Sequence, residues 1–172
     1  MAWVAWGLAA VIGVFAIGPS AKPAPSATAH IHITKSSHRL EVIDHEKVVR
    51  TFGVSIGPGG AGAKHREGDK VTPVGRYHVV SHVPSTYHVF FRLDYPNAED
   101  RARFKQMQAA GELPKDATIG GDIGIHGAPP QPEWKATHKE VDWTLGCIAL
   151  DDTEVDELAT LVKDGAIVDI DD

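Results

Sequence analysis

A chain of 172 residues with 42% hydrophobic and 23% charged residues has the composition of a globular protein, which excludes wholesale disorder and allows one domain with a real core. The formal net charge is -6 without a lysine or arginine cluster, so the basic face of a general nucleic-acid binder is missing. A single cysteine excludes an internal disulfide.

The first 29 residues differ in composition from the rest of the chain. Residues 1–17 contain no charge and are mostly apolar, although this run is slightly shorter than the roughly 20 residues that span a bilayer. A Pro/Ala/Ser stretch follows, and Ala27-Thr28-Ala29 has the small-x-small pattern of a signal-peptidase site. We therefore expect residues 1–29 to be a signal peptide or membrane anchor with a linker, and residues 30–172 to be exported. A buried core helix is the alternative for the apolar run.

Alternating apolar and polar residues predict a β-meander at the start of the exported part. Three ranges share the alternation: 30–34, 39–42 and 47–56. A turn is expected at 44–46, and in the third range Val48 and Phe52 are expected to share the apolar face with Val54 and Ile56. Further strands are predicted at 75–80, 87–91, 119–126 and 166–170.

Two helices and one unusual loop complete the prediction. Asn97 is a suitable N-cap for a short helix that ends near Gly111. Asp151 and Glu154 resemble a capping box, and Gly165 suits the C′ position of the helix that follows. Residues 57–69 are rich in glycine and predict a loop with several unusual backbone angles. The fold class expected is therefore mostly β with one or two short helices.

Two segments carry residues that fit nucleophilic catalysis. A nucleophilic thiol needs a base that takes its proton and backbone N–H groups that receive an oxyanion. His126 ends an apolar strand, and Cys147 follows Gly146, which lets another backbone approach closely. The loop at 128–142 contains three prolines and Trp134 and is expected to form a rigid lid or pocket wall. We expect this loop to bring the imidazole of His126 within hydrogen-bonding reach of the Cys147 sulfur. An inert, buried cysteine is the alternative, because ten histidines make some pairing inevitable.

Motifs in two separated parts of the chain resemble a known family. His126-Gly127, then a loop, then Thr144-Leu145-Gly146-Cys147-Ile148 is similar to the signature of the L,D-transpeptidase catalytic domain, of YkuD type. Lys64, Gly68-Asp69 and Thr72-Pro73-x-Gly75-x-Tyr77 resemble a second stretch of that family, and Asp142-Trp143-Thr144 with Tyr95-Pro96-Asn97 resemble its YafK- or ErfK-like subgroup. The resemblance covers roughly residues 29–170 and implies a β-rich, sandwich-like or barrel-like fold.

The resemblance also implies roles for individual residues. Cys147 is expected to be the acylated nucleophile and His126 its base, with the Gly127 carbonyl orienting the imidazole and the N–H groups around Gly146 and Cys147 forming the oxyanion hole. Thr144 is expected to hold the loop in place. Four residues are expected to contact substrate: Thr144, Trp143, Trp134 and Tyr95.

The implied partners are the stem peptides of peptidoglycan, carbapenem-type inhibitors and, through the N-terminal segment, a membrane; no nucleic acid, cofactor or metal is implied. One position departs from the family. Many members carry Arg two residues after the cysteine, where this chain has Ala149. If that Arg holds a substrate carboxylate, another cation must replace it, and Lys64, Arg66 and Arg92 are the candidates.

These residues are compatible with several functions. The leading one is a transpeptidase that forms a thioester at the L-centre of a diaminopimelate–D-alanine bond and passes the acyl group to an amine. An L,D-carboxypeptidase would let water resolve the same thioester, and a catalytically silent envelope binding module is a third possibility. A metal site built from clustered histidines, and a catalytic rather than turn-capping role for Asp69, are further alternatives.

Overall fold

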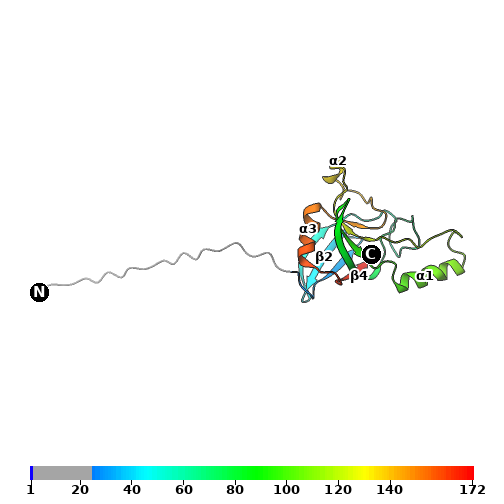
Figure 1. Cartoon of the computed structure of the whole chain (residues 1–172), viewed down its shortest axis with the longest axis horizontal. Coiled ribbons are helices and arrows are strands. Elements are labelled where there is room, and N and C mark those ends of the chain that lie inside the picture. Colours follow the sequence, from blue (N-terminus) through cyan, green and yellow to red (C-terminus); the bar gives the residue numbers. More distant parts are fainter. Residues whose placement is uncertain (2–24) are drawn as a thin grey trace.

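Eight strands form one curled sheet in the part of the chain that the computed structural model describes, Met1 and residues 25–172 (Figure 1). The strands are β1 (His30–Thr34), β2 (Arg39–Asp44), β3 (Lys47–Gly53), β4 (Gly75–Ser85), β5 (His88–Leu93), β6 (Gly124–His126), β7 (Ile148–Ala149) and β8 (Ile167–Asp171). Their order across the sheet is β3-β2-β1-β8-β4-β5-β6-β7. This mostly β architecture confirms the expected fold class.

The sheet curls because β4 belongs to both of its halves. The first residues of β4 pair antiparallel with β8, with Tyr77 opposite Val168. The later residues pair antiparallel with β5, after a register shift between Val79 and Ser81. A bulge of this kind bends a strand and increases its twist. The buried apolar core lies inside the curl and includes at least one residue from each of the eight strands; β6 contributes Ile125. The largest members of the core include Tyr77, Phe52, Phe91, Ile31 and Ile33.

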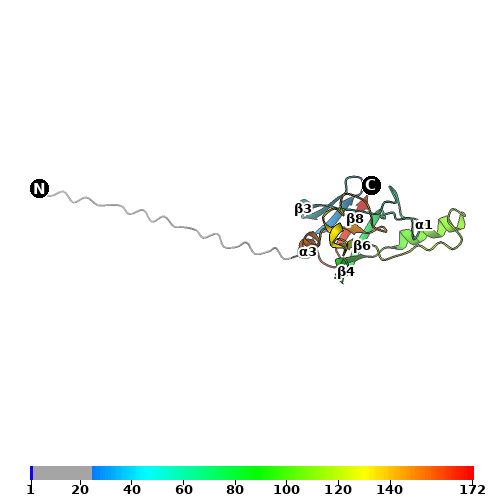
Figure 2. The same ribbon diagram turned by 90° about the horizontal axis from the view of Figure 1, so that it is seen from above.

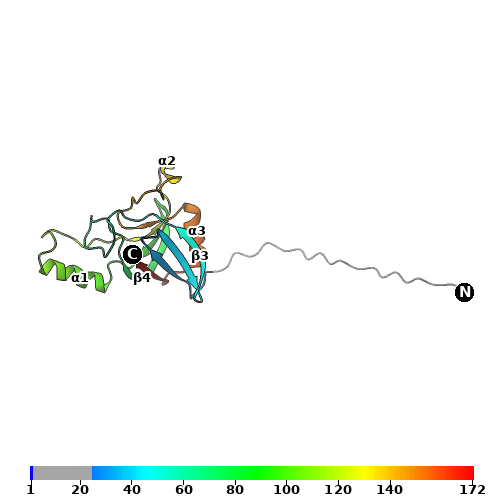
Figure 3. The same ribbon diagram turned by 180° about the vertical axis from the view of Figure 1, so that it is seen from behind.

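Three helices accompany the sheet in the described residues: α1 (Ala98–Ala109), α2 (Pro132–Lys135) and α3 (Asp152–Leu161). Figures 1 and 2 show α1 and α3 at opposite ends of the folded part. The predicted caps are confirmed, since Asn97 and Asp100 form a capping box on α1 and Asp151 and Glu154 form one on α3. α3 lies beside β3 (Figure 3), where Arg50 makes two hydrogen bonds to Glu157.

Three local predictions were wrong. Val48 is 52% exposed although Phe52 is buried, because the register shifts between Val42 and Ile43 on the neighbouring strand and β3 is an edge strand. The strand expected at 119–126 is only three residues long. Gly165, with φ of 89°, lies in the turn before β8, while Val162 is the C-cap of α3.

The expected signal peptide or anchor falls mainly on residues 2–24, which lie outside the described residues. The end of the expected linker packs onto the domain: the hydroxyls of Ser26 and Thr28 donate to the Asp44 carboxylate, and Ala29 is 6% exposed. Among the described residues, no helix is long and apolar enough to cross a membrane.

Candidate active site

Two short parallel strands bring His126 and Cys147 to the same region of the sheet. In the register of β6 and β7, Ile125 is opposite Ile148 and His126 is opposite Ala149, so Cys147 lies immediately before β7 and His126 ends β6. The Leu150 N–H donates to the His126 carbonyl at 2.8 Å. The sheet therefore holds these two residues, which are far apart in the chain, on or next to neighbouring strands.

The loop before Cys147 is held by one buried hydroxyl. Thr144 Oγ1 donates to the Cys147 carbonyl at 2.7 Å and accepts from the Gly146 N–H at 3.2 Å. Gly146 has φ of 124°, and a Cβ there would lie 2.7 Å from the Val71 carbonyl oxygen, so only glycine fits. The predicted structural role of Thr144 is confirmed. The Gly146 N–H is engaged by Thr144, whereas the Cys147 N–H has no hydrogen-bond partner within residues 25–172.

The imidazole of His126 is fixed in one tautomer. Its Nδ1 lies 2.8 Å from the Gly127 carbonyl oxygen, which can only accept, so Nδ1 carries the hydrogen and Nε2 of the neutral ring has the free lone pair. Burial lowers the pKa of His126, an effect that outweighs the hydrogen bond to Gly127. A Cβ at Gly127 would lie 2.6 Å from Oδ1 of Asp152, so this position also requires glycine.

Aromatic rings surround this imidazole. The ring centroids of Tyr87, Phe90 and Trp143 lie 4.6, 6.1 and 5.7 Å from that of His126. These rings exclude water, and this burial is the reason that the charged form of the imidazole is disfavoured.

The thiol of Cys147 is neutral at rest and turned away from the imidazole. Its Sγ donates to the Asp122 carbonyl oxygen at 3.5 Å, and no hydrogen bond joins it to His126 among the described side chains. The expected direct contact between sulfur and imidazole is therefore absent in this side-chain rotamer. Burial raises the pKa of Cys147 to about 11, although the backbone of Gly124 and the charge of Lys64 lower it in part. Cys147 is nonetheless half-buried rather than sealed in the core.

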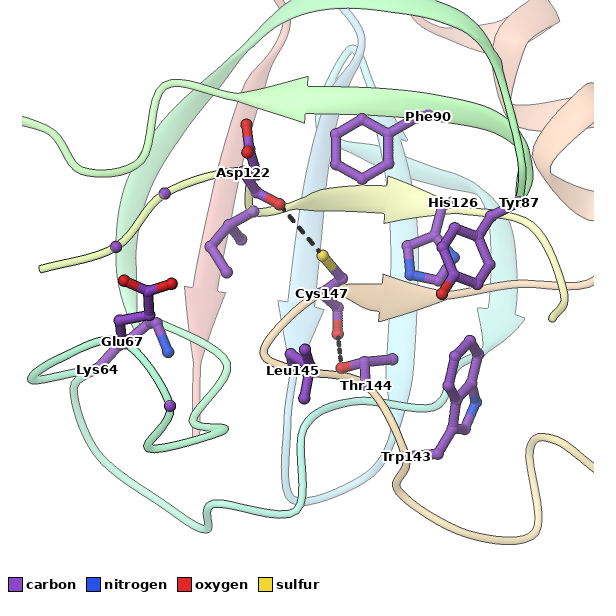
Figure 4. Close-up of a pocket in the computed structure, with 14 residues that line it drawn as sticks. Lys64, Glu67, Tyr87, Phe90, Asp122, His126, Trp143, Thr144, Leu145 and Cys147 are labelled. Atoms are coloured by element: carbon purple, nitrogen blue, oxygen red, sulfur yellow. Dashed lines mark hydrogen bonds between the residues drawn. The ribbon is translucent and has the colours of Figure 1, made fainter. Parts of the chain in front are cut away.

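Cys147 and His126 line one cavity of about 550 Å³ (Figure 4). In the close-up, His126, Tyr87 and Trp143 lie on one side of Cys147, and Lys64 and Glu67 lie on the other. The cavity is lined by Lys64, Glu67, Gly68, Tyr87, Phe90, Gly120, Gly121, Asp122, Ile123, His126, Trp143, Thr144, Leu145 and Cys147. A volume of this size accommodates a small peptide fragment rather than a folded chain.

The structure brings together only some of the residues expected to contact substrate. Trp143 and Thr144 line the cavity, but Trp134 and Tyr95 do not. Trp134 lies on α2 with 52% exposure, and Tyr95 is 5% exposed with its hydroxyl donating to the Ile119 carbonyl. Residues 128–142, expected to form a lid or pocket wall, also lie outside the cavity lining. They are fastened to the start of α3 instead, where His138 bonds to Asp151 at 2.9 Å.

The sequence analysis did not single out several lining residues, among them Glu67, Tyr87, Phe90 and Asp122, and it quoted Leu145 only as part of the motif. Phe90 lies opposite His126 in the pairing of β5 with β6. A pattern of aromatic residues predicts a strand but not its partner or register, so no local signal could have placed Phe90 beside the histidine. For Leu145, its position between Thr144 and Gly146 in the motif was the available signal.

No group of three or more histidine, cysteine, aspartate or glutamate side chains that could hold a metal is found in the described part of the chain. The clustered histidines have separate partners instead. His78, His82 and His88 bond to Asp94, Asp164 and Asp156, respectively, at distances of 3.1, 2.7 and 2.9 Å. Asp69 accepts hydrogen bonds from Lys64 and from three backbone N–H groups, which is the turn-capping role.

Known proteins share the fold of this chain. The family model described as the L,D-transpeptidase catalytic domain matches residues 28–170. The helical cell shape determining protein Pgp2 from Campylobacter jejuni is similar, with a TM-score of 0.60 and 25% identity over 83% of this chain and 47% of that chain. Bd1075 from Bdellovibrio bacteriovorus has a TM-score of 0.57 and 18% identity over 83% of this chain and 47% of that one.

An L,D-transpeptidase from Xylanimonas cellulosilytica has a TM-score of 0.52 and 16% identity over 91% of this chain and 64% of that chain, a likeness of fold. This chain thus spans about half the length of the first two solved structures that it matches. A search of curated proteins gave no match.

Proposed function

Because the chain belongs to the L,D-transpeptidase catalytic domain family, we propose that it is a cysteine acyltransferase that crosslinks or remodels peptidoglycan through an acyl-enzyme on Cys147. The observation that carries the proposal is the shared cavity, which is lined by both a half-buried thiol and a neutral imidazole with a free Nε2. An inert core cysteine would need neither the cavity nor a histidine held in the tautomer of a base.

The first half of the reaction acylates the sulfur. Rotation about the Cα–Cβ bond of Cys147 moves the S–H from the Asp122 carbonyl toward Nε2 of His126. The imidazole takes the proton as the sulfur attacks the carbonyl at the L-centre of the diaminopimelate–D-alanine bond. The Cys147 N–H, which has no partner within the described chain, is the donor available to the developing oxyanion. The C–N bond breaks, and D-alanine leaves with the proton that His126 holds.

The second half resolves the thioester. An amine from another stem attacks the acyl carbon, His126 accepts the amine's proton, and the sulfur leaves as thiolate and recovers a proton from the imidazolium. The products are an amide crosslink and the free thiol. With water as the acceptor the same steps yield a tripeptide, the outcome for a carboxypeptidase.

The resting charge state shapes this mechanism. With the pKa of Cys147 raised to about 11 and that of His126 lowered, both groups are neutral near pH 7. The thiolate therefore forms only as substrate displaces water and the proton moves to Nε2, rather than existing as a stored ion pair. This arrangement protects a free cysteine from oxidation in an oxidising compartment, because the thiolate is the reactive form.

Members of this family act on peptidoglycan in the cell envelope. We place residues 30–172 there as the catalytic domain, with residues 1–29 as the signal peptide or membrane anchor that exports it. Stem peptides are the proposed substrate, and carbapenem-type β-lactams, which acylate such thiols, are the proposed inhibitors. Cell shape is the process that the printed name of the Campylobacter jejuni relative suggests.

Incubation of the purified protein with disaccharide-tetrapeptide separates the candidate functions. A dimer with loss of one D-alanine indicates transpeptidation, and a disaccharide-tripeptide indicates carboxypeptidase activity. A binding module would give neither product. We expect D-alanine release by the native protein and none by Cys147→Ala; release that survives this substitution would refute the proposal.

A further inference from the structure

The cavity has a second, charged end whose residues have no part in the acyl transfer described above. Lys64 and Glu67 lie on the side of Cys147 that faces away from His126 (Figure 4). Asp122 lines the cavity too, and its carboxylate is paired with Arg92. Two opposite charges, those of Lys64 and Glu67, therefore line the same cavity as the thiol.

Lys64 is a buried cation with unused hydrogen-bonding capacity. Its side chain is 3% exposed, and its Nζ donates to Asp69 Oδ1 at 2.5 Å. An ammonium has three N–H donors, and Asp69 is the one partner found for Lys64 among residues 25–172. Burying a cation is costly unless its donors are satisfied, so a wall-lining ammonium with donors to spare fits an anionic ligand group.

Asp69 cannot supply the missing bonds. Its Oδ1 already accepts from Lys64 and from the Val71 N–H, and its Oδ2 accepts from the N–H groups of His65 and Arg66. Burial opposes ionisation of Asp69, but these donors outweigh it and hold the pKa of the carboxyl below its usual range. The carboxylate is thus fixed in place as a support for Lys64, and the remaining donors of the ammonium are left for a ligand.

Glu67 determines what kind of anion fits. Its Oε2 accepts from the Thr118 hydroxyl at 2.5 Å, and its Oε1 has no partner among the described residues. A purely anionic ligand such as phosphate would be attracted by Lys64 and repelled by Glu67. A group that carries both an ammonium and a carboxylate would complement both residues.

We infer that Lys64 and Glu67 form a specificity subsite for a zwitterionic side-chain terminus, the ammonium and carboxylate of the diaminopimelate residue in the donor stem. This inference rests on the proposed function. It also assigns a replacement for the cation missing at Ala149: Lys64 lines the cavity, Arg92 is paired with Asp122, and Arg66 lies outside the cavity lining.

The test uses three tetrapeptide donors that differ only in the third residue: diaminopimelate, diaminopimelate with its side-chain carboxylate amidated, and lysine. D-Alanine release is measured in a single turnover without an acceptor, so that only acylation is observed. Loss of a hydrogen bond to a charged group predicts that the second-order rate constant of acylation of the native protein is roughly 10- to 100-fold higher with diaminopimelate than with either analogue.

Lys64→Met should remove this preference by slowing only the diaminopimelate donor, and Lys105→Met, a substitution of an exposed lysine outside the cavity, should preserve it. Glu67→Gln should slow acylation by the diaminopimelate donor. A fourth donor, in which the side-chain amine of diaminopimelate is acetylated, should react with this variant at the rate that it has with the native protein. Melting temperature and iodoacetamide labelling of Cys147 check that each variant is folded.

The possible failures are distinguishable. Equal rates for all three donors on the native protein would overturn the subsite and leave the proposed function intact, and this comparison needs no variant. Equal slowing of all donors by Lys64→Met, or slowing only of the transfer step when an acceptor is added, would also overturn it. No D-alanine release from any donor by the native protein would instead refute the proposed function.

Discussion

Alkylation of Cys147 as a function of pH distinguishes a neutral thiol from a stored thiolate–imidazolium pair. With the pKa at about 11, the thiolate fraction at pH 7 is about 1 in 10,000, and it rises about tenfold per pH unit up to pH 10. Because the chain contains one cysteine, the mass increase on iodoacetamide treatment reports this thiol alone. The measurement is the pseudo-first-order rate of that mass change between pH 6 and pH 11.

We expect the rate to rise continuously toward pH 10 or above, without a plateau near neutral pH. His126→Ala should leave this profile almost unchanged, since no hydrogen bond joins the imidazole to the sulfur in the described structure. A rate that reaches its plateau below pH 8, and loses that plateau in His126→Ala, would refute the reasoning. The thiol would then be ionised by a preformed pair, as in other cysteine enzymes.

Three further changes test the geometry around the site. Thr144→Val removes a buried hydroxyl that makes two hydrogen bonds, so we expect a loss of about 1–3 kcal/mol in unfolding free energy and a slower acylation by a carbapenem. The control Thr51→Val, on the exposed face of β3, should change neither quantity. Gly127→Ala should cost about 1–3 kcal/mol in a denaturant titration because its Cβ would lie 2.6 Å from a carboxylate oxygen, while Gly53→Ala, with open space around it, should be tolerated. Folding lowers the pKa of His126, so the unfolded state binds more protons and the free energy of unfolding should fall as the pH drops below about 6.5. His126→Gln should weaken this pH dependence. A pH profile that the substitution leaves unchanged would contradict the buried neutral imidazole.

The elements that the sequence predicted best are those with local signals. The turn at 44–46 depends on two residues with positive φ, and the caps at Asn97 and Asp151 depend on side chains within three residues of the helix start. Such signals are short-range, so they survive without knowledge of the fold. The motif around Cys147 belongs to the same class, because Thr144 bonds to atoms two and three residues away.

Features that depend on strand pairing could not be read from the sequence. The exposure of Val48 follows from a register shift on a neighbouring strand, and the place of Phe90 follows from the pairing of β5 with β6. Trp134 was expected near the site because its loop connects the two motifs. The hydrogen bond from His138 to Asp151 instead fastens that loop to α3. Side chains that decide the path of a loop are outside the reach of local pattern arguments.

The central claim is that the sulfur of Cys147 carries the acyl group of a stem peptide. The most direct measurement is intact-protein mass spectrometry of an acid-quenched mixture with disaccharide-tetrapeptide, followed by peptide mapping of the adduct. We expect a thioester at Cys147 with the mass of the stem minus D-alanine, and no adduct on Cys147→Ala. D-Alanine released at the native rate by Cys147→Ala, or an adduct mapped to another residue, would contradict it.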